Sequence, residues 1–194
     1  MKCLKKLALT AATAVLVTGF AFTSQAKEWK GWNIHKPGYP NTVALDSFAE
    51  MLEKKSGGKM KLKMYHSATL GNQSDAIEQV RAGALEIANF SLGPLGPTVP
   101  ETNVVSLPFI FKNTDHVWRV LENSKAGEIM KKGMEAKGLV SLAWYDGGAR
   151  SFYNFHKPIE TPADVKGMKI RVMNNDLYSG MIAALDGNPT PMAF

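Results

Sequence analysis

The sequence contains 194 residues, of which 45% are hydrophobic and 21% are charged, and its formal net charge is +6. Its single cysteine, Cys3, lies in a segment that we expect to be removed, so disulfides, cysteine-ligated metals and thiol catalysis are excluded for the mature chain. Stability must then come from an ordinary packed core, which a chain of this length can bury.

The first 26 residues are typical of a secretory signal peptide. Lys2, Lys5 and Lys6 precede an apolar run over residues 7–22, and residues 24–26 give a small-x-small cleavage pattern. The run is too short to favour a membrane-spanning helix, although an uncleaved anchor is the alternative. Cleavage leaves 20 Lys and Arg against 17 Asp and Glu, a net charge of +3, so we expect a soluble, exported protein and no nucleic-acid partner.

Strand-like and helix-like segments then alternate at short spacing, which favours an α/β fold with a largely parallel sheet. Apolar positions repeat with a helical period after Pro40, and Met60, Leu62 and Met64 alternate with lysines as in a half-covered strand. The pattern predicts strands at 29–34, 60–64 and 87–90 and helices at 40–55 and 74–81.

The middle of the chain predicts two more helices between strands. Two prolines and two glycines predict an irregular loop over 93–97, and 104–107 reads as a return to the sheet. One helix begins at Asn113 or Thr114, and the next runs from Ser124 towards Gly138 with Ile129 and Met130 inward. Residues 139–145 are predicted as a strand.

Gly147 and Gly148 indicate a crossover, so we expect a first lobe at 27–147 and the start of a second at 148–194. The second part is predicted to contain strands at 150–155 and 168–173, a short helix capped by Thr161, a helix at about 176–185 and an extended segment at 188–194. Fewer than fifty residues are few for an independent core, so we expect this second lobe to be incomplete in the chain.

Five strings in compatible order carry a family resemblance: residues 65–71, 106–109, 148–150, 164–172 and 188–194. The chain resembles the substrate-binding subunit, or DctP family, of tripartite ATP-independent periplasmic (TRAP) transporters. The resemblance implies a two-lobed periplasmic-binding-protein fold of the Venus-flytrap type, which closes on a small organic acid in the periplasm. It also implies membrane transporter subunits as partners and no catalysis. The oligomeric state cannot be read from the sequence, but a shuttle that docks on a transporter by one face is expected to be a monomer, and no cofactor is expected.

Arg171 is the first candidate for ligand binding. Its apolar neighbours in 168–173 predict a strand buried on both faces, where an arginine needs an anionic partner. The planar guanidinium can donate two parallel hydrogen bonds to a carboxylate, and the carboxyl ends of strands are where α/β sheets bind ligands. The alternative is an arginine at a sheet edge that reaches water or a structural aspartate. The resemblance implies that Arg171 grips the carboxylate of the ligand.

Other candidates surround this arginine. Arg150 follows the crossover glycines and, by the resemblance, supplies a second basic contact. Asn174 or Asn175 can cap the next helix or offer an amide to the ligand, and Phe194 matches an aromatic that covers it, although core packing is its plainer role. Weaker candidates, expected to face the cleft from the first lobe, are Asn33, His35, Asn72, Phe90 and Ser91.

The four histidines, His35, His66, His116 and His156, are scattered, so no metal site is predicted. Nucleophile-elbow, zinc-protease and phosphate-loop motifs are absent from the sequence. A binding protein for another transporter or a chemoreceptor remains open, as does a secreted α/β enzyme acting on a sugar acid or ester. The ligand can be a C4-dicarboxylate, a sugar acid or a related acid, and the paired asparagines mildly favour a hydroxylated one.

Overall fold

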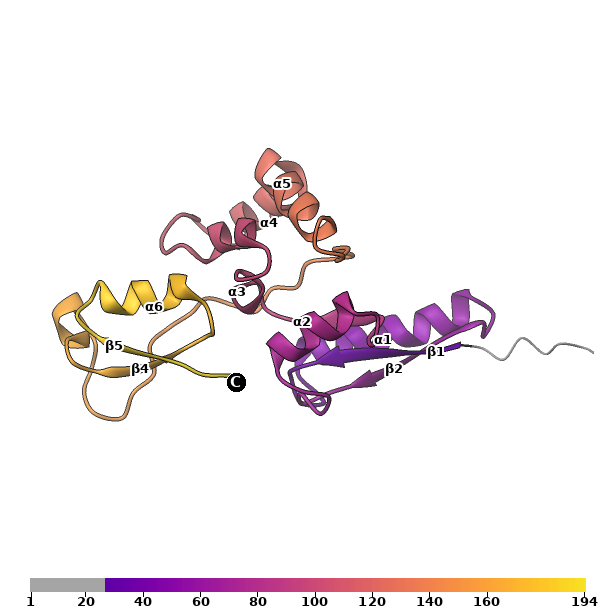
Figure 1. Ribbon diagram of the computed structural model, residues 1–194, viewed down its shortest axis with the longest axis horizontal. Coiled ribbons are helices and arrows are strands. Elements are labelled where there is room, and N and C mark those ends of the chain that lie inside the picture. The colour runs from indigo at the N-terminus through magenta and orange to yellow at the C-terminus, as the bar shows by residue number, and fades with distance from the viewer. Residues whose placement is uncertain (1–26) are drawn as a thin grey trace, which may run out of the picture.

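The computed structural model describes residues 27–194, and the expected signal peptide at 1–26 lies outside the described residues. Two separate parallel sheets lie at opposite sides of the view, helices α3, α4 and α5 lie between and above them, and the chain ends between the two sheets (Figure 1). The expected α/β character with parallel strands is therefore confirmed.

The first sheet has the strand order β2-β1-β3, with both neighbours parallel to β1. We call residues 27–91 the N-terminal unit. Its elements are β1 (Lys27–Asn33), α1 (Pro40–Lys55), β2 (Met60–Tyr65), α2 (Gln73–Arg81) and β3 (Ile87–Asn89). In β2, Leu62 is buried while Lys61 and Lys63 are exposed, as the period-two alternation predicts.

Local signals explain where the two helices of this unit begin. Pro40 occupies the first turn of α1, where its missing N–H costs no helical hydrogen bond. Asn72 caps α2 by accepting hydrogen bonds from the N–H groups of Ser74 and Asp75, and the Asp75 carboxylate accepts the N–H of Asn72 in return. This reciprocal capping fixes the start of α2.

The core of the N-terminal unit is built around Trp32, which is fully buried. Its ring packs in a cluster with Ile34, Ala76 and Leu85, and its indole N–H donates to the carbonyl oxygen of Gly71 at 3.0 Å. The cluster joins β1 to α2, so the sheet and the start of α2 are held as one packed body.

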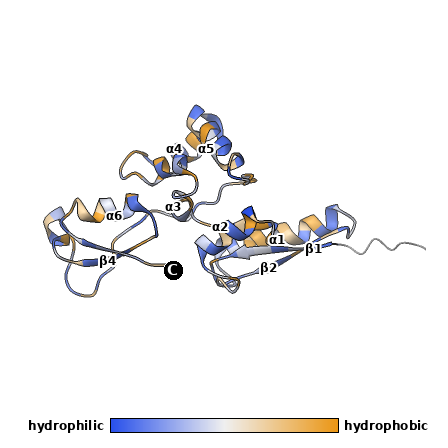
Figure 2. Ribbon diagram, viewed as in Figure 1, coloured by the Kyte–Doolittle hydropathy of each residue, from blue (hydrophilic) through white to orange (hydrophobic). Residues whose placement is uncertain are grey.

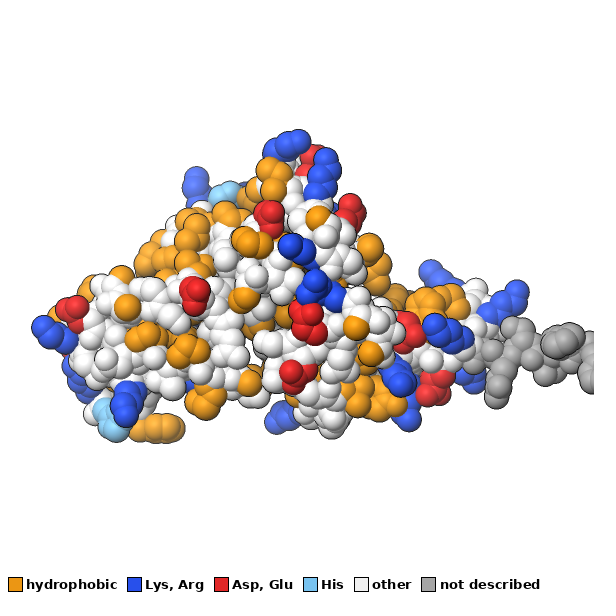
Figure 3. Space-filling view, in the orientation of Figure 1, with side chains coloured by type: hydrophobic (Ala, Val, Ile, Leu, Met, Phe, Trp, Pro, Cys, Tyr) orange, Lys and Arg blue, Asp and Glu red, His pale blue; other side chains and the backbone are white. Residues whose placement is uncertain are grey.

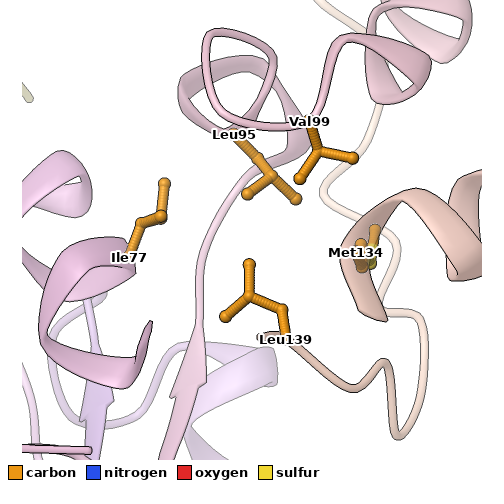
Figure 4. Close-up of a cluster of buried hydrophobic side chains, with 5 residues drawn as sticks. All are labelled: Ile77, Leu95, Val99, Met134 and Leu139. Atoms are coloured by element: carbon orange, nitrogen blue, oxygen red, sulfur yellow. The ribbon is translucent and has the colours of Figure 1, made fainter. Parts of the chain in front are cut away.

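A helical segment, residues 92–135, follows the first sheet. It contains α3 (Leu92–Leu95), the 3-10 helix η1 (Pro100–Ser106), α4 (Thr114–Asn123) and α5 (Lys125–Glu135). Asn113 and Ser124 cap α4 and α5 through their side-chain oxygens, as predicted. A second cluster fills the space between α2, α3 and α5 and is shown in Figure 4: Ile77, Leu95, Val99, Met134 and Leu139.

Two predictions for this region are wrong. Residues 93–97 are not wholly irregular, because α3 forms a single turn in which Pro94 lies in the first turn and loses no helical bond. Residues 104–107 do not form a strand, because η1 begins at Pro100 and extends to Ser106. A short apolar run is compatible with either a strand or a helical turn, and in this segment it forms a helical turn.

The inward face of α5 was also predicted only in part, because Met130 is fully buried but Ile129 is 47% exposed. The strands expected at 139–145 and 150–155 are wrong, since the described residues have no strand between α5 and β4. A strand needs a hydrogen-bonding neighbour, and these segments pair with none of the strands that are described. Phe155 in this connection is fully exposed.

The C-terminal unit, residues 161–194, contains the second sheet. Its elements are the 3-10 helix η2 (Pro162–Val165), β4 (Lys169–Val172), α6 (Asp176–Ala183) and β5 (Asn188–Pro191). Thr161 and Asp164 form the capping box of η2. β4 and β5 pair in parallel, and α6 packs on them through Val172, Met173, Tyr178 and Ile182.

The surface is mixed. Hydrophobic and hydrophilic residues both occur along the helices in Figure 2, and basic and acidic side chains are interspersed on the face shown in Figure 3. None of the helices described in 27–194 is long and apolar enough to cross a membrane.

Candidate functional site

A pocket lies where the N-terminal unit, the start of the helical segment and the C-terminal unit meet. It is lined by Asn72, Gln73, Ser74, Pro94, Arg171, Met173, Asn174, Met192, Ala193 and Phe194. These residues come from the start of α2, from α3, from the end of β4 and from the chain after β5. Arg171 is the one charged residue in this lining, so the pocket is built around a single cation.

Arg171 is held beside the end of the chain. Its Nε–H donates to the carbonyl oxygen of Met192 at 2.9 Å, and its guanidinium carbon lies 5.9 Å from the ring centre of Phe194. Phe194 is 81% exposed, so its ring forms part of the pocket wall and not of a core. The arrangement leaves the terminal guanidinium nitrogens without a hydrogen bond to the described residues, and those nitrogens are the pair that can bind a carboxylate.

The prediction that the Arg171 strand is buried on both faces is wrong. Arg171 and Lys169 are exposed, whereas Val172 is buried. Among the described residues β4 pairs with β5 alone and is covered by α6 on one side. The other side of the strand is therefore open, and Arg171 lies there.

A second cation acts on Arg171. Partial burial lowers the pKa of Arg171, and the positive charge of Arg150 lowers this pKa further. The guanidinium of Arg150 lies 5.7 Å from the ring centre of Tyr178, outside the pocket lining. Neither arginine forms a salt bridge with an acidic residue of the described part of the chain, so two like charges are left for an anion to balance.

The structure separates the roles of the two asparagines. Asn174 lines the pocket. Asn175 is buried, and its Oδ1 caps α6 by accepting the N–H of Leu177 at 2.9 Å. Its Nδ2 donates to the carbonyl oxygen of Gly93 and to Oδ1 of Asn103, both at 2.7 Å. Asn175 therefore positions the pocket and does not line it.

These bonds belong to a seam between the start of α6 and the α3–η1 region, which we call the α6 seam. The hydroxyl group of Tyr178 lies 3.0 Å from that of Ser106 in the same seam. A side chain at Gly96 would meet the side-chain amides of Asn103 and Asn175, so these amides would have to move out of their present contact to make room for it. The seam holds the end of β4, and with it Arg171, next to α3.

The first-lobe candidates divide in the same way. Asn72 lines the pocket, although its side-chain oxygen is used to cap α2. Asn33 is fully buried and its Nδ2 donates to the hydroxyl group of Thr42 at 2.7 Å. His35 stacks on Tyr39 with ring centres 3.9 Å apart, and burial lowers its pKa. Neither Asn33 nor His35 lines the pocket.

Phe90 and Ser91 also lie outside the pocket lining. Phe90 packs against both clusters of buried side chains, and the backbone N–H of Ser91 donates to Oε1 of Gln73 at 2.7 Å. Sequence reasoning missed Gln73 and Ser74, which line the pocket directly after the Asn72 cap. The available signal was their place at the start of a helix that follows a strand, where open α/β sheets bind ligands.

The described residues contain no cluster of three His, Cys, Asp or Glu side chains suited to a metal ion. His66 instead lies 2.9 Å from a carboxylate oxygen of Asp46. The chemistry that the pocket offers is thus one guanidinium, several amide and hydroxyl groups and an aromatic wall. Such a set can bind an anionic, partly polar small molecule and includes no nucleophile paired with a base.

Known proteins are similar to this chain in both sequence and structure. A solute-binding protein of Chromohalobacter salexigens is 52% identical over 180 residues, which are 93% of this chain and 53% of that protein. Two solved TRAP periplasmic solute-binding proteins each superpose with a TM-score of 0.84 over 86% of this chain and 55% of theirs. One, from Roseobacter denitrificans with bound β-D-glucuronate, is 66% identical, and the other, from Sulfitobacter with bound β-D-galacturonate, is 52% identical.

The chain spans about half the length of these relatives. The family model that matches is DctP, bacterial extracellular solute-binding protein, family 7, and it covers residues 33–194. The match begins at the last residue of β1 and includes the other four strands and every residue of the pocket. The chain belongs to the DctP family of bacterial extracellular solute-binding proteins.

Proposed function

We propose that this protein captures a small organic acid in the periplasm and delivers it to the membrane subunits of a TRAP transporter, without catalysing a reaction. The observation that carries the proposal is Arg171, the single charged residue in a pocket that has no acidic side chain in its lining. A guanidinium specifies the sign of the ligand and, through its planar donors, the orientation of a carboxylate.

Electrostatics support an anionic ligand. The pKa of Arg171 is lowered by partial burial and then by the charge of Arg150, so both burial and the second cation raise the free energy of the charged form of Arg171. A carboxylate bound to Arg171 reduces both costs, whereas a neutral sugar reduces neither. The Phe194 ring beside the guanidinium supplies an apolar surface for the carbon skeleton of the ligand.

A sugar acid is the ligand class that the proposal favours. The similar proteins of Roseobacter denitrificans and Sulfitobacter were solved with bound uronates, and both share more than half of the aligned residues with this chain. The pocket lining includes the side chains of Asn72, Gln73, Ser74 and Asn174, which can form hydrogen bonds with hydroxyl groups.

The proposed function includes a closing motion. A lobe at 27–147 and a second lobe from 148 would close on the acid, and the acid would favour the closed state by contacting both lobes.

The test is thermal unfolding of the full-length exported protein and of Arg171→Ala with D-glucuronate, D-galacturonate and succinate, using D-glucose and L-alanine as controls. A ligand at about 100 times its Kd should stabilise the protein by roughly 2.7 kcal/mol. We expect the acids to raise the unfolding midpoint of the unaltered protein and not that of Arg171→Ala. Arg171→Lys is the matched control, because it keeps the charge but loses the planar pair of donors.

Two results would contradict the proposal. If D-glucose stabilises the protein as well as D-glucuronate does, the pocket does not select a carboxylate. If Arg171→Ala responds to the acids as the unaltered protein does, the carboxylate is bound elsewhere.

A further inference from the structure

Gln73 differs from the other polar residues of the pocket because it is 92% buried, with a relative exposure of 8%, and still forms part of the lining. It is the first residue of α2, in the N-terminal unit, whereas Arg171 belongs to β4 in the C-terminal unit. A ligand gripped by Arg171 therefore meets Gln73 from the other unit.

The orientation of the Gln73 amide is fixed by its contact with Ser91. The backbone N–H of Ser91 lies 2.7 Å from Oε1 of Gln73, and a backbone N–H can only donate. The atom that receives it must therefore be the amide oxygen, which determines which end of the side chain is the nitrogen. Gln73 cannot exchange its oxygen and nitrogen to suit a ligand without losing this bond.

The amide nitrogen of Gln73 is available to a ligand in the pocket. Residues 27–194 provide no hydrogen bond to Nε2 of Gln73, and this atom is not among the buried polar atoms that lack a partner, so it keeps access to solvent in the pocket. The amide oxygen of Asn72 is likewise used, in the cap of α2, and Pro94 has no backbone N–H to offer a ligand. The wall contributed by α2 thus offers a fixed donor, with the rotatable hydroxyl group of Ser74 beside it.

We infer that Gln73 is a specificity-determining residue, whose amide N–H groups, oriented by Ser91, select organic acids that place an acceptor oxygen against the start of α2. The inference rests on the proposed function, because it assumes a carboxylate on Arg171. A hydroxyl group, a ring oxygen or a second carboxylate can fill this position. A uronate meets the requirement, and an acid with an oxygen-free ring does not.

Gln73→Glu separates this role from a purely structural one. Glutamate has nearly the same shape and can still accept the N–H of Ser91, so the start of α2 keeps its contact with the β3–α3 connection. It replaces the donor with a second carboxylate oxygen, which repels an acceptor. We expect the Kd for D-glucuronate, measured by calorimetry on the full-length protein, to rise by about tenfold to a hundredfold.

Ser74→Ala is the matched control on the neighbouring lining residue, and we expect it to raise the Kd less than Gln73→Glu does, because a hydroxyl group that rotates is not fixed as a donor. Cyclohexanecarboxylate tests the ligand side with the unaltered protein. It keeps the six-membered ring and the carboxylate but has no other oxygen, and we expect it to bind at least about a hundredfold more weakly than D-glucuronate.

The outcomes distinguish the inference from the function on which it rests. If the unaltered protein binds D-glucuronate, Arg171→Ala abolishes binding and Gln73→Glu binds unchanged, the role of Gln73 is wrong and the proposed function stands. Equal affinity for cyclohexanecarboxylate and D-glucuronate overturns the role of Gln73 even if the variant does not fold. If the unaltered protein binds none of the acids, the proposed function fails, and the inference fails with it.

Discussion

The two sheets of the molecule are covered to different degrees. In the N-terminal unit β1 has a neighbour on each side, and Trp32 and Ala76 in its core have no exposed surface. In the C-terminal unit β4 pairs with β5 alone among the described strands, and every member of its core cluster retains 5–9% exposure. The better-packed sheet is the more rigid of the two, and the more open sheet carries Arg171, the charged group that we propose binds the ligand.

The difference shows how an exposed arginine can still be placed accurately. Arg171 has little packing of its own, but it lies four residues before Asn175, which is buried in the α6 seam. The contacts of Asn175 with Gly93 and Asn103 fix the end of β4 against the helical segment. Precision at the pocket therefore depends on the seam more than on the sheet that carries the arginine.

The largest expected effect comes from removing the centre of the better-packed sheet. Trp32→Ala deletes a fully buried ring and its hydrogen bond to Gly71, and we expect it to lower the free energy of unfolding by about 3–5 kcal/mol. The measurement is urea denaturation of the full-length protein. Phe155→Ala is the control, since Phe155 is fully exposed and its loss should cost less than about 0.5 kcal/mol. If the two variants lose similar amounts of unfolding free energy, the contrast between the well-packed N-terminal sheet and the exposed surface is wrong.

The neighbouring asparagines give the next test. Asn175→Ala removes the cap of α6, worth about 1 kcal/mol, and leaves Oδ1 of Asn103 without its donor, which costs roughly 1–3 kcal/mol more, while the carbonyl oxygen of Gly93 keeps the N–H of Gly96. Asn174→Ala should leave the free energy of unfolding within about 0.5 kcal/mol of the original, because the side chain is exposed. Denaturation and calorimetry on both variants check this.

The same two variants should differ in how they affect binding of the ligand. We expect Asn174→Ala to weaken D-glucuronate binding with stability unchanged, and Asn175→Ala to weaken it only together with stability. The distinction fails if Asn174→Ala destabilises the protein as much as Asn175→Ala does, or if Asn175→Ala has no effect on either quantity.

Sequence reasoning succeeded where the signal is local. The caps at Asn113, Ser124 and Thr161 and the alternation in β2 depend on neighbouring residues, and the structure contains all of them. The apolar runs at 104–107 and 139–145 were predicted as strands and are not, because a strand also needs a partner that its own residues do not specify.

The pocket shows the same limit. Arg171 could be proposed from residue chemistry and a family resemblance, since a guanidinium near a strand end is a local feature. Its exposure could not, because the extent to which β4 is covered depends on contacts far away in the chain. Gln73 was missed for a related reason: its place in the lining and its bond to Ser91 exist only after α2 and β3 have been brought together.

The smallest expected effect concerns the start of the open sheet, at η2. Hydrogen bonds from the hydroxyl and N–H groups of Thr161 hold the pKa of Asp164 well below its ordinary value of 3.8, and Lys157 and the N–H of Glu160 lower it further. The unfolded chain therefore binds a proton at Asp164 at a higher pH than the folded chain does. The resulting stabilisation is fully present well above pH 3.8 and is lost as the pH falls below it.

Asp164→Asn should accordingly be less stable than the unaltered protein at pH 7, and the difference should shrink as the pH is lowered past 3.8. Urea denaturation at pH 7 and at pH 3 measures it, and Thr161→Val, which removes the hydroxyl donor, should show a smaller pH-dependent difference between Asp and Asn at position 164. A difference that does not change with pH would mean that the cap acts by shape alone. Since η2 immediately precedes β4, a loss of this cap at low pH would loosen the C-terminal sheet before it affects the core around Trp32.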